Sequence, residues 1–281
     1  FSRRSYDRDD EEIGRLTDGE KGRNEEKQIA MSKRLKREYP AVATVSGKQH
    51  IGMVEEIFST IPERYDFLNH LMSFSMDRGW RKFTVKKMRF FQTHRFLDIA
   101  TGTGDLAITA ACAYPDIKIA GLDFAREMMA VGTEKVERRH LSDRIAFLQG
   151  DAMQIPLPDK SVDVTAVAFG IRNMPDRKRA LKEMRRVTTP GGQVMVLEMN
   201  YPQGSWWTGF YRFYLKQIMP WIAALFTRNP AAYRYLVDSI MNFPQPDAFG
   251  RLMQQAGLKN IVHYPLTLGT TYLHVGERPH E

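Results

Sequence analysis

Hydrophobic positions change their spacing near residue 95, and this change separates two kinds of predicted structure. Between residues 51 and 72 apolar side chains recur every three or four positions, interrupted at Pro62, which predicts helices. Another helix is predicted over residues 79–88. Beyond residue 95, short apolar runs typical of buried strands alternate with helical patterns. The first part is therefore expected to be a helical cap and the second an α/β core.

The α/β pattern predicts an open parallel sheet with helices on both faces. Strands are expected at 95–100, 117–123, 145–151, 162–169 and 193–199, and helices at 105–114, 126–139 and 176–187. "TPGG" (189–192) reads as a turn. Residues 201–246 are helical, aromatic and interrupted by proline, and residues 260–278 read as two strands around a glycine turn.

Composition adds a tail to this picture. Residues 1–48 are rich in charges of both signs and poor in apolar residues, so a flexible tail is expected there. Residues 49–281 are then one domain. It comprises a helical cap (49–90), a cofactor-binding core (95–200), a helical insert (201–246), and a C-terminal helix and hairpin (247–281).

Charge and cysteine content limit the class of protein. The single cysteine, Cys112, excludes a disulfide framework and favours a reducing compartment. No apolar run reaches the length of a membrane span. The formal net charge of +8 is spread among acidic residues rather than concentrated in a basic block. We therefore expect weak attraction to anionic lipid and no nucleic-acid partner.

The sharpest local motif is "FLDIATGTGDLAI" (96–108). A buried strand ends at Asp98, and Gly102, Thr103 and Gly104 form a tight turn before a helix that begins near Asp105. In an open parallel sheet such a turn lies at the carboxyl edge, where ligands bind. Residues 102–107 also fit G-x-G-x-x-A, so a dinucleotide-binding dehydrogenase remains an alternative.

Acidic residues at successive strand ends favour S-adenosylmethionine as the cofactor. Asp98 can help to hold its cationic amino-acid end, and Asp123 can accept both ribose hydroxyls. Asp151 can accept from the adenine amino group while the Ala152 amide donates to the ring. Each carboxylate alone could be a cap or turn residue, but three at consecutive strand ends favour a methyltransferase.

Four segments carry a resemblance to a family. "YDFLNHLMSFSMDRGW" (65–80), "AFGIRNMPD" (168–176), "RRVTTPGGQVMVLEMN" (185–200) and "YRYLVDSI" (233–240) resemble the UbiE-type C-methyltransferases of ubiquinone and menaquinone biosynthesis. The resemblance runs from about residue 50 to 278. The chain departs from the family pattern at Asp77, where histidine is usual, at Thr189, and at Ala168, where some relatives have serine beside the cofactor.

The resemblance implies a class I methyltransferase fold, which is a Rossmann-like sheet of seven mostly parallel strands with the last one antiparallel. It implies transfer of a methyl group to a ring carbon of a polyprenyl hydroquinone, either demethylmenaquinol or 2-methoxy-6-polyprenyl-1,4-benzoquinol, without a metal. The alternatives are a sterol or phospholipid methyltransferase, an NAD-dependent dehydrogenase, and a non-catalytic scaffold of a quinone-synthesis complex.

Carbon methylation requires an electron-rich ring, so a group that stabilises a phenolate is expected. Arg172 and Asn173 follow the fourth strand directly and are candidates for substrate binding, with Arg172 catalytic or, alternatively, held in a salt bridge. Tyr65 and Asn69 are candidates to hydrogen-bond the ring oxygens or the cofactor carboxylate, or else to pack and cap a helix. His70 is a weaker candidate for a proton relay, and Glu198 is expected to fix the loop.

The aromatic segment 201–246 suggests the partners. Its Trp, Tyr and Phe side chains suit an isoprenoid groove, a membrane surface, or the interface of a homodimer. The resemblance adds other quinone-biosynthesis enzymes as partners. It implies a cytoplasmic location peripheral to the inner membrane, or alternatively the matrix side of the mitochondrial inner membrane.

Overall fold

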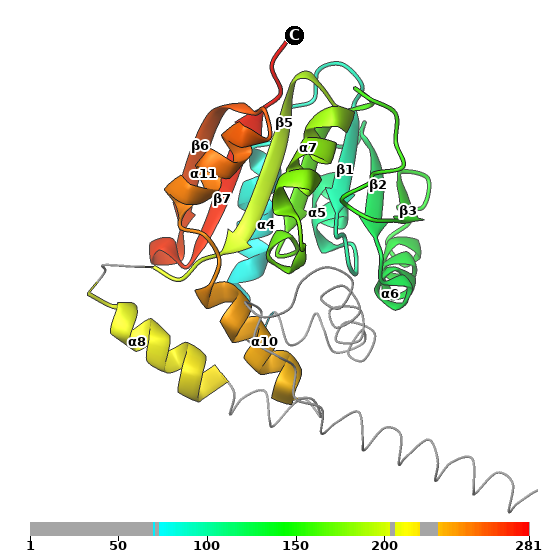
Figure 1. The fold of residues 1–281 in the computed structure, drawn as a ribbon. Helices are drawn as coiled ribbons and strands as arrows, with labels where there is room; N and C mark the ends of the chain where they lie inside the picture. Colours follow the sequence, from blue (N-terminus) through cyan, green and yellow to red (C-terminus); the bar gives the residue numbers. More distant parts are fainter. Residues whose placement is uncertain (1–69, 71–72, 203–205, 220–229, 281) are drawn as a thin grey trace, which may run out of the picture.

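The computed structural model describes residues 70, 73–202, 206–219 and 230–280, and these contain a seven-stranded sheet with helices on both faces (Figure 1). The strand order is β3-β2-β1-β4-β5-β7-β6. β7 runs antiparallel to both of its neighbours, and the other adjacent strands are parallel. The predicted fold class, including the single antiparallel strand, is confirmed.

The strands are β1 (Arg95–Ile99), β2 (Lys118–Asp123), β3 (Ile145–Gln149), β4 (Val162–Ala168), β5 (Thr188–Met199), β6 (Lys259–Leu266) and β7 (Thr271–Glu277). The helices beside the sheet are α4 (Met76–Lys86), α5 (Asp105–Ala113), α6 (Arg126–Glu137), α7 (Arg177–Val187) and α11 (Pro246–Gln255). α8 (Thr208–Phe213) continues into a π-helical turn (Tyr214–Ile218), and α10 is Pro230–Met241. Short 3-10 turns are Ile171–Asn173 and Thr267–Gly269.

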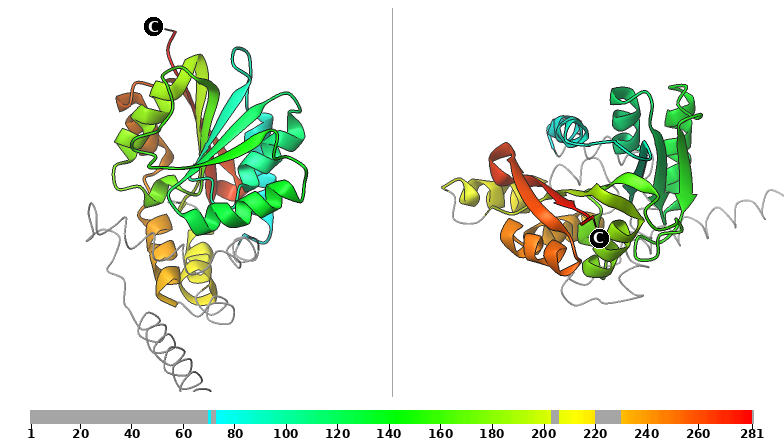
Figure 2. Two further views of the ribbon diagram at one scale, coloured as in Figure 1. Left: turned by 90° about the vertical axis from the view of Figure 1, so that its right-hand side faces the viewer. Right: turned by 90° about the horizontal axis from the view of Figure 1, so that it is seen from above.

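Alternation along β1 explains the two packed faces. Phe96 packs with residues of α4, α5 and α6, such as Trp80, whereas Leu97 and Ile99 pack with residues of α7 and α11, such as Leu181. The view from above shows α4 and α5 on one side of the sheet and α7 and α11 on the other (Figure 2). Because Asp98 lies two positions after Phe96 on the same strand, its side chain also points towards α4 and α5.

α8 and α10 lie beyond the carboxyl ends of the parallel strands (Figure 1). They pack against each other through a separate cluster that includes Tyr211, Leu215, Met219, Val237 and Ile240. The helical character expected for 201–246 is therefore present over Thr208–Ile218 and Pro230–Met241. None of the described helices is long and apolar enough to cross a membrane.

Two boundaries differ from those expected. "TPGG" is not a separate turn, because β5 begins at Thr188 and passes through these residues with an irregular register opposite β4. Hydrogen bonds with Arg278 at the end of β7 hold Gly191 and Gly192 in the sheet, with the Arg278 carbonyl accepting from Gly191 and the Arg278 amide donating to Gly192. The helix expected from residue 79 begins earlier, at Met76. The tail 1–48 and residues 49–69 of the cap lie outside the described residues.

The connection from α4 to β1 is held by a fully buried carboxylate. Asp163 of β4 accepts backbone hydrogen bonds from Phe91, Gln92, Thr93 and His94 at 2.9–3.1 Å. Burial alone would raise the pKa of Asp163, but these donors outweigh it and the pKa lies below its usual value. This carboxylate therefore fixes the loop between α4 and β1 against β4.

Candidate active site

The turn between β1 and α5 is built around left-handed backbone. Gly102 and Gly104 have φ of 56° and 78°, a region that glycine enters without steric cost. Behind the turn, Asp98 accepts from Thr101 Oγ1 at 2.7 Å and from the Ala107 amide at 3.1 Å. Burial raises the pKa of Asp98 to about 7, although both donors oppose the rise. Asp98 thus braces the turn from inside the protein.

A cavity of about 180 Å³ opens at the carboxyl ends of β1, β2 and β4. Of the residues predicted to bind the cofactor or substrate, Gly102, Asp123, Asp151, Ala152 and Asn173 line it. The other predicted cofactor residues lie just behind this surface. Asp98, Thr103 and Gly104 belong to the turn, and Ala168 precedes the lining residue Phe169.

Asp123 ties the second strand to the glycine turn. Its Oδ2 accepts from the Gly102 amide at 2.7 Å and its Oδ1 from the Ala125 amide at 2.9 Å. Burial raises the pKa of this carboxyl, and the amide donors pull it back. A carboxylate has about four acceptor positions, and the Phe124 amide also hydrogen-bonds to this one, so acceptor capacity remains for a ligand hydroxyl in the cavity. The donors fix both oxygens in place without exhausting them.

The far wall of the cavity suits a planar, hydrogen-bonding ring. Asp151 is exposed, and its Oδ1 accepts from the Met153 amide at 2.8 Å, which fixes the carboxylate beside Ala152. Apolar walls come from Leu122, Met128 and Met153. Carboxylate acceptors for hydroxyl and amino groups, a main-chain segment and apolar walls are together what an adenosine requires. The residues present therefore fit S-adenosylmethionine.

A second cavity, of about 30 Å³, is also lined by Phe169. Phe169 lines both cavities, and the second is also lined by Ser73, Asp77, Trp80, Arg81, Arg172, Met199, Met219 and Leu236. Gly170 follows, and a side chain there would place its Cβ 2.6 Å from the Cβ of Ala100. The absence of a side chain at Gly170 therefore lets the end of β4 approach β1 closely, next to the residue that lines both cavities.

Arg172 is held by a buried ion pair. Its Nη1 donates to Glu198 Oε1 at 2.6 Å and to the Phe169 carbonyl at 2.7 Å, and both charged side chains are nearly or fully buried. The salt bridge considered from the sequence is present, and the same guanidinium also lines the second cavity. Arg177 donates to the Arg172 carbonyl at 3.0 Å, so two guanidinium groups accompany one carboxylate.

Asn173 is bonded to a residue that the sequence did not single out. The Tyr235 hydroxyl of α10 donates to Asn173 Oδ1 at 3.2 Å. Burial raises the pKa of Tyr235 to about 12, although Arg172 and Arg177 lower it. The phenol is therefore neutral at pH 7 and acts as a donor. "YRYLVDSI" contributed to the family resemblance, but helical periodicity alone assigned Tyr235 no role.

Two substrate candidates, Tyr65 and Asn69, lie outside the described residues. The adjacent His70 is described, and its Nδ1 lies 2.8 Å from Asp77 Oδ2. Ser73 Oγ donates to Asp77 Oδ1 at 2.8 Å, and Arg81 forms an ion pair with Asp77. Burial would raise the pKa of Asp77, but Arg81, His70 and Ser73 together lower it. Asp77 is thus ionised at the start of α4.

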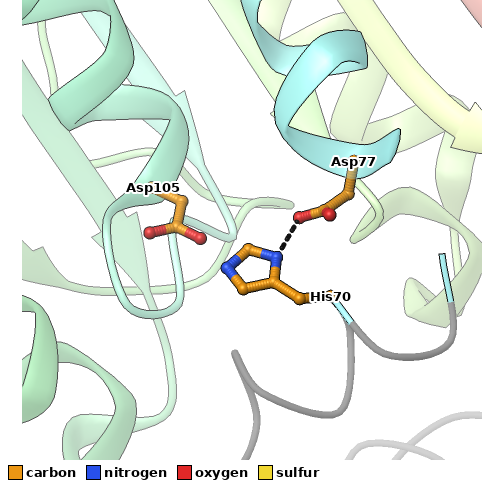
Figure 3. Close-up of side chains that lie close together, drawn as sticks. All are labelled: His70, Asp77 and Asp105. Atoms are coloured by element: carbon orange, nitrogen blue, oxygen red, sulfur yellow. Dashed lines mark hydrogen bonds and ion pairs between the residues drawn. The ribbon is translucent and has the colours of Figure 1, made fainter. Parts of the chain in front are cut away.

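His70, Asp77 and Asp105 approach one another closely enough to raise the question of a metal ion. Figure 3 shows the imidazole between the two carboxylates, and the nearest donor atoms all lie within 4.8 Å of one another. However, Arg81 pairs with Asp77 and Lys135 pairs with Asp105. Each carboxylate is already neutralised by a basic side chain, so this cluster fits an ion-pair network rather than a cation site.

Comparison with known proteins places the chain among methyltransferases. The model of the ubiE/COQ5 methyltransferase family matches residues 43–278. A ubiquinone/menaquinone biosynthesis C-methyltransferase UbiE from Geotalea daltonii is 43% identical over 226 residues, covering 80% of this chain and 96% of the relative. A demethylmenaquinone methyltransferase from Thermus thermophilus is 41% identical over 223 residues, covering 79% and 100%.

Solved structures agree on the fold. A putative methyltransferase in complex with the Trm112 activator from Haloferax volcanii aligns with a TM-score of 0.57 at 18% identity, covering 79% of this chain and 98% of that one. An S-adenosylmethionine-dependent methyltransferase from Thermotoga maritima aligns with a TM-score of 0.55 at 18% identity, with the same coverage. At this identity the likeness concerns the fold alone.

Proposed function

The chain belongs to the ubiE/COQ5 methyltransferase family, and from that premise we propose that it methylates a ring carbon of a polyprenyl hydroquinone. It is an S-adenosylmethionine-dependent methyltransferase of quinone biosynthesis. The names of its relatives, which refer to ubiquinone and menaquinone biosynthesis and to demethylmenaquinone, support a quinone precursor as substrate. Demethylmenaquinol and 2-methoxy-6-polyprenyl-1,4-benzoquinol are the substrates that the family resemblance implies. The observation that supports the proposal most directly is the second, small cavity, where the charged side chains of Asp77, Arg81 and Arg172 meet aromatic and aliphatic side chains beside the cofactor cavity.

The cofactor residues keep the roles expected from the sequence. Asp123 accepts the ribose hydroxyls, Asp151 and Ala152 hold the adenine, and Gly102, Thr103 and Gly104 form the turn beneath. Asp98 contributes negative charge beneath the amino-acid end, and Ala168 sets Phe169 at the end of β4. When bound, S-adenosylmethionine supplies a methyl group made electrophilic by its sulfonium.

Arg172 stabilises the phenolate. An aromatic carbon becomes nucleophilic when the neighbouring hydroxyl loses its proton, and the negative charge that develops on oxygen needs a preorganised partner. Arg172 and Arg177 carry two positive charges against the single charge of Glu198, which leaves this wall of the site with a surplus positive charge. Glu198 and the Phe169 carbonyl hold the Arg172 guanidinium in place before substrate arrives.

The remaining predicted substrate residues surround the ring. Asn173 lines the cofactor cavity and accepts from Tyr235, so its amide is oriented towards the boundary between cofactor and substrate. From the family resemblance we assign Tyr65 and Asn69 the role of hydrogen-bond partners of the ring oxygens. Met199, Met219 and Leu236 supply apolar walls for the beginning of the isoprenoid tail.

The outer side of α8 suits a membrane surface. Trp206, Phe210 and Phe213 are 94%, 69% and 55% exposed, and the basic residues Arg212 and Lys216 are exposed beside them. Residues 206–219 contain no acid. Exposed aromatic side chains with interspersed basic residues are typical of helices that lie on anionic bilayers. Met219, near the end of this helical segment, lines the second cavity, so docking here brings the site to the lipid that holds the substrate.

Vesicle sedimentation tests this docking surface. The protein should bind phosphatidylglycerol-containing vesicles, and Phe210→Ser/Phe213→Ser should weaken binding about tenfold or more. Phe91→Ser is the matched control, because Phe91 is 52% exposed on the loop between α4 and β1. Equal binding by all three proteins, or dimerisation through this face in sedimentation velocity, would overturn the membrane assignment.

A substrate panel tests the proposed reaction. The protein is incubated with methyl-labelled S-adenosylmethionine and, separately, with short-tailed naphthoquinols, benzoquinols, a sterol and phosphoethanolamine. Label should enter one or both quinols, and the product mass should increase by one methylene. Transfer only to the sterol or the amine would select the other methyltransferase classes. Tight binding of a nicotinamide dinucleotide without methyl transfer would favour a dehydrogenase.

A further inference from the structure

Arg81 is a buried cation beside the glycine turn, and it takes no part in the proposed stabilisation of the phenolate. It is 8% exposed, and its guanidinium carbon lies 5.4 Å from the centre of the ring of Phe169, a residue that lines both cavities. Its Nη2 lies 3.9 Å from Oδ2 of Asp105, the residue that follows Gly104. These contacts place the guanidinium on the α4 side of the turn, at the junction of the cofactor and substrate spaces.

The two edges of this guanidinium differ. Nη1 forms the ion pair with Asp77. The Nη2 edge faces Asp105 at a distance beyond a hydrogen bond. Asp105 is itself paired with Lys135, whose Nζ also donates to Thr103 Oγ1 at 3.1 Å. Asp105 therefore does not occupy the Nη2 edge, and within the described part of the chain no hydrogen-bond acceptor does, so this edge is directed at the rim of the turn.

We propose that Arg81 binds the carboxylate of the amino-acid end of the cofactor. A planar guanidinium recognises a carboxylate with directed N–H donors, and the partly desolvated rim of the turn strengthens that bond. The adenosine end occupies the wall formed by Asp123 and Asp151, so the amino-acid end extends across Gly102 towards α4. This inference depends on the cofactor and not on the identity of the methyl acceptor.

Asp77 is the positioning residue for Arg81. It is 2% exposed and lies four residues before Arg81 on the same helix, so its carboxylate and the guanidinium meet on one face. Ser73 and His70 hold the other positions of the Asp77 carboxylate at 2.8 Å each. Figure 3 shows His70 reaching from the segment before α4 to Asp77. The arrangement fixes the guanidinium before the cofactor binds and leaves its second edge open.

Decarboxylated S-adenosylmethionine isolates the proposed contact, because it lacks only the carboxylate. Titration calorimetry without any methyl acceptor compares the two ligands in the wild-type protein and in Arg81→Gln. The wild-type protein should bind S-adenosylmethionine about 10- to 100-fold more tightly than its decarboxylated form, the range expected for a charged hydrogen-bonded contact. Arg81→Gln should lose most of that difference while its affinity for the decarboxylated ligand stays nearly constant.

Three further measurements separate binding from support of the fold. Methylthioadenosine, which lacks the whole amino-acid end, should bind wild type and Arg81→Gln equally. Arg138→Gln is the matched control, because Arg138 is 70% exposed and, in the part of the chain that the structure describes, pairs with Glu134. Asp77→Asn should reduce the preference for S-adenosylmethionine partway without changing the affinity for methylthioadenosine, because the guanidinium is then less well held.

Equal binding of the two cofactor forms by the wild-type protein would overturn the proposal without any variant. So would an Arg81→Gln protein that weakens all three ligands by the same factor, since that is the result of a purely structural role. If Arg81→Gln fails to bind methylthioadenosine, Arg81→Lys replaces it and keeps Asp77 neutralised. That variant should lose about three- to tenfold of the preference, and an unchanged preference would count against the assignment.

Discussion

Replacement of Arg172 by methionine tests the proposed stabilisation of the phenolate. The side chain of Glu198 is 0% exposed, and the substitution removes the Arg172 donor that lies 2.6 Å from it. Removing one partner of a buried pair typically costs about 3–5 kcal/mol of folding stability. Removing one preorganised donor to a developing oxyanion lowers kcat by about 10²–10³-fold. Arg172→Met should therefore lose both stability and turnover.

Glu198→Gln separates these two losses. It breaks the same ion pair, so the free energy of unfolding should also fall, but it leaves the guanidinium charge in the substrate cavity. We expect its kcat to stay within about tenfold of wild type at a temperature where both proteins are folded. The double variant Arg172→Met/Glu198→Gln removes both buried charges and should be more stable than the sum of the single losses predicts.

The assay is steady-state methyl transfer to a short-tailed quinol, with cofactor affinity measured by calorimetry and stability by urea unfolding. Arg172→Met should bind S-adenosylmethionine within about twofold of wild type, because the contact acts only as charge develops. An Arg172→Met protein with wild-type kcat would show that Arg172 does not stabilise the phenolate. So would equal losses of kcat and cofactor affinity in Arg172→Met and Glu198→Gln, since that result belongs to a salt bridge that only pins the loop.

Three other predictions follow from buried carboxylates. Asp123→Ala should weaken S-adenosylmethionine binding at least tenfold in calorimetry with the fold intact by circular dichroism, and unchanged affinity would remove Asp123 from the site. Burial raises the pKa of Asp98 to about 7, so this carboxylate under the cationic ligand is neutralised as pH drops from 8 to 6. Cofactor affinity should therefore fall over this pH range. An equally steep fall in the Asp98→Asn protein would contradict this. Asp163→Asn should lower the free energy of unfolding by about 2–4 kcal/mol at pH 7, because charged hydrogen bonds are lost. Since the pKa of Asp163 is depressed in the folded state, this loss should shrink as pH falls below about 4. A loss that does not change with pH in urea unfolding would be inconsistent with this.

Much of the cofactor side was predictable because it depends on local signals. The alternation of strands and helices indicated the sheet, and the acids at the ends of consecutive strands indicated its ligand-binding edge. Gly102, Asp123 and Asp151 lie on one cavity because the carboxyl ends of neighbouring parallel strands meet at that edge. The direction of every strand and the antiparallel hairpin were also predicted correctly.

The parts of the site formed by α4 and α10 were less predictable, because they are assembled by contacts between distant segments. Arg81 has a local signal, its spacing from Asp77, but nothing in the sequence places it beside Asp105 at the glycine turn. Tyr235 reaches Asn173 from 62 positions away in the chain. Helical periodicity indicates which face of a segment is apolar and does not show which element covers it. The continuous β5 through "TPGG" has the same cause, because pairing with Arg278 overrides a local turn signal.

In the proposed reaction, methyl groups are transferred to a ring carbon of a quinol beside Arg172. The most direct test is nuclear magnetic resonance of the product formed from a short-tailed quinol and S-adenosylmethionine labelled with ¹³C in its methyl group. We expect the wild-type protein to give a carbon-bound methyl signal, ortho to a ring oxygen, and the Arg172→Met protein to lose it. An oxygen-bound methyl signal, or no label on any quinol from a protein that binds the cofactor normally, would contradict it.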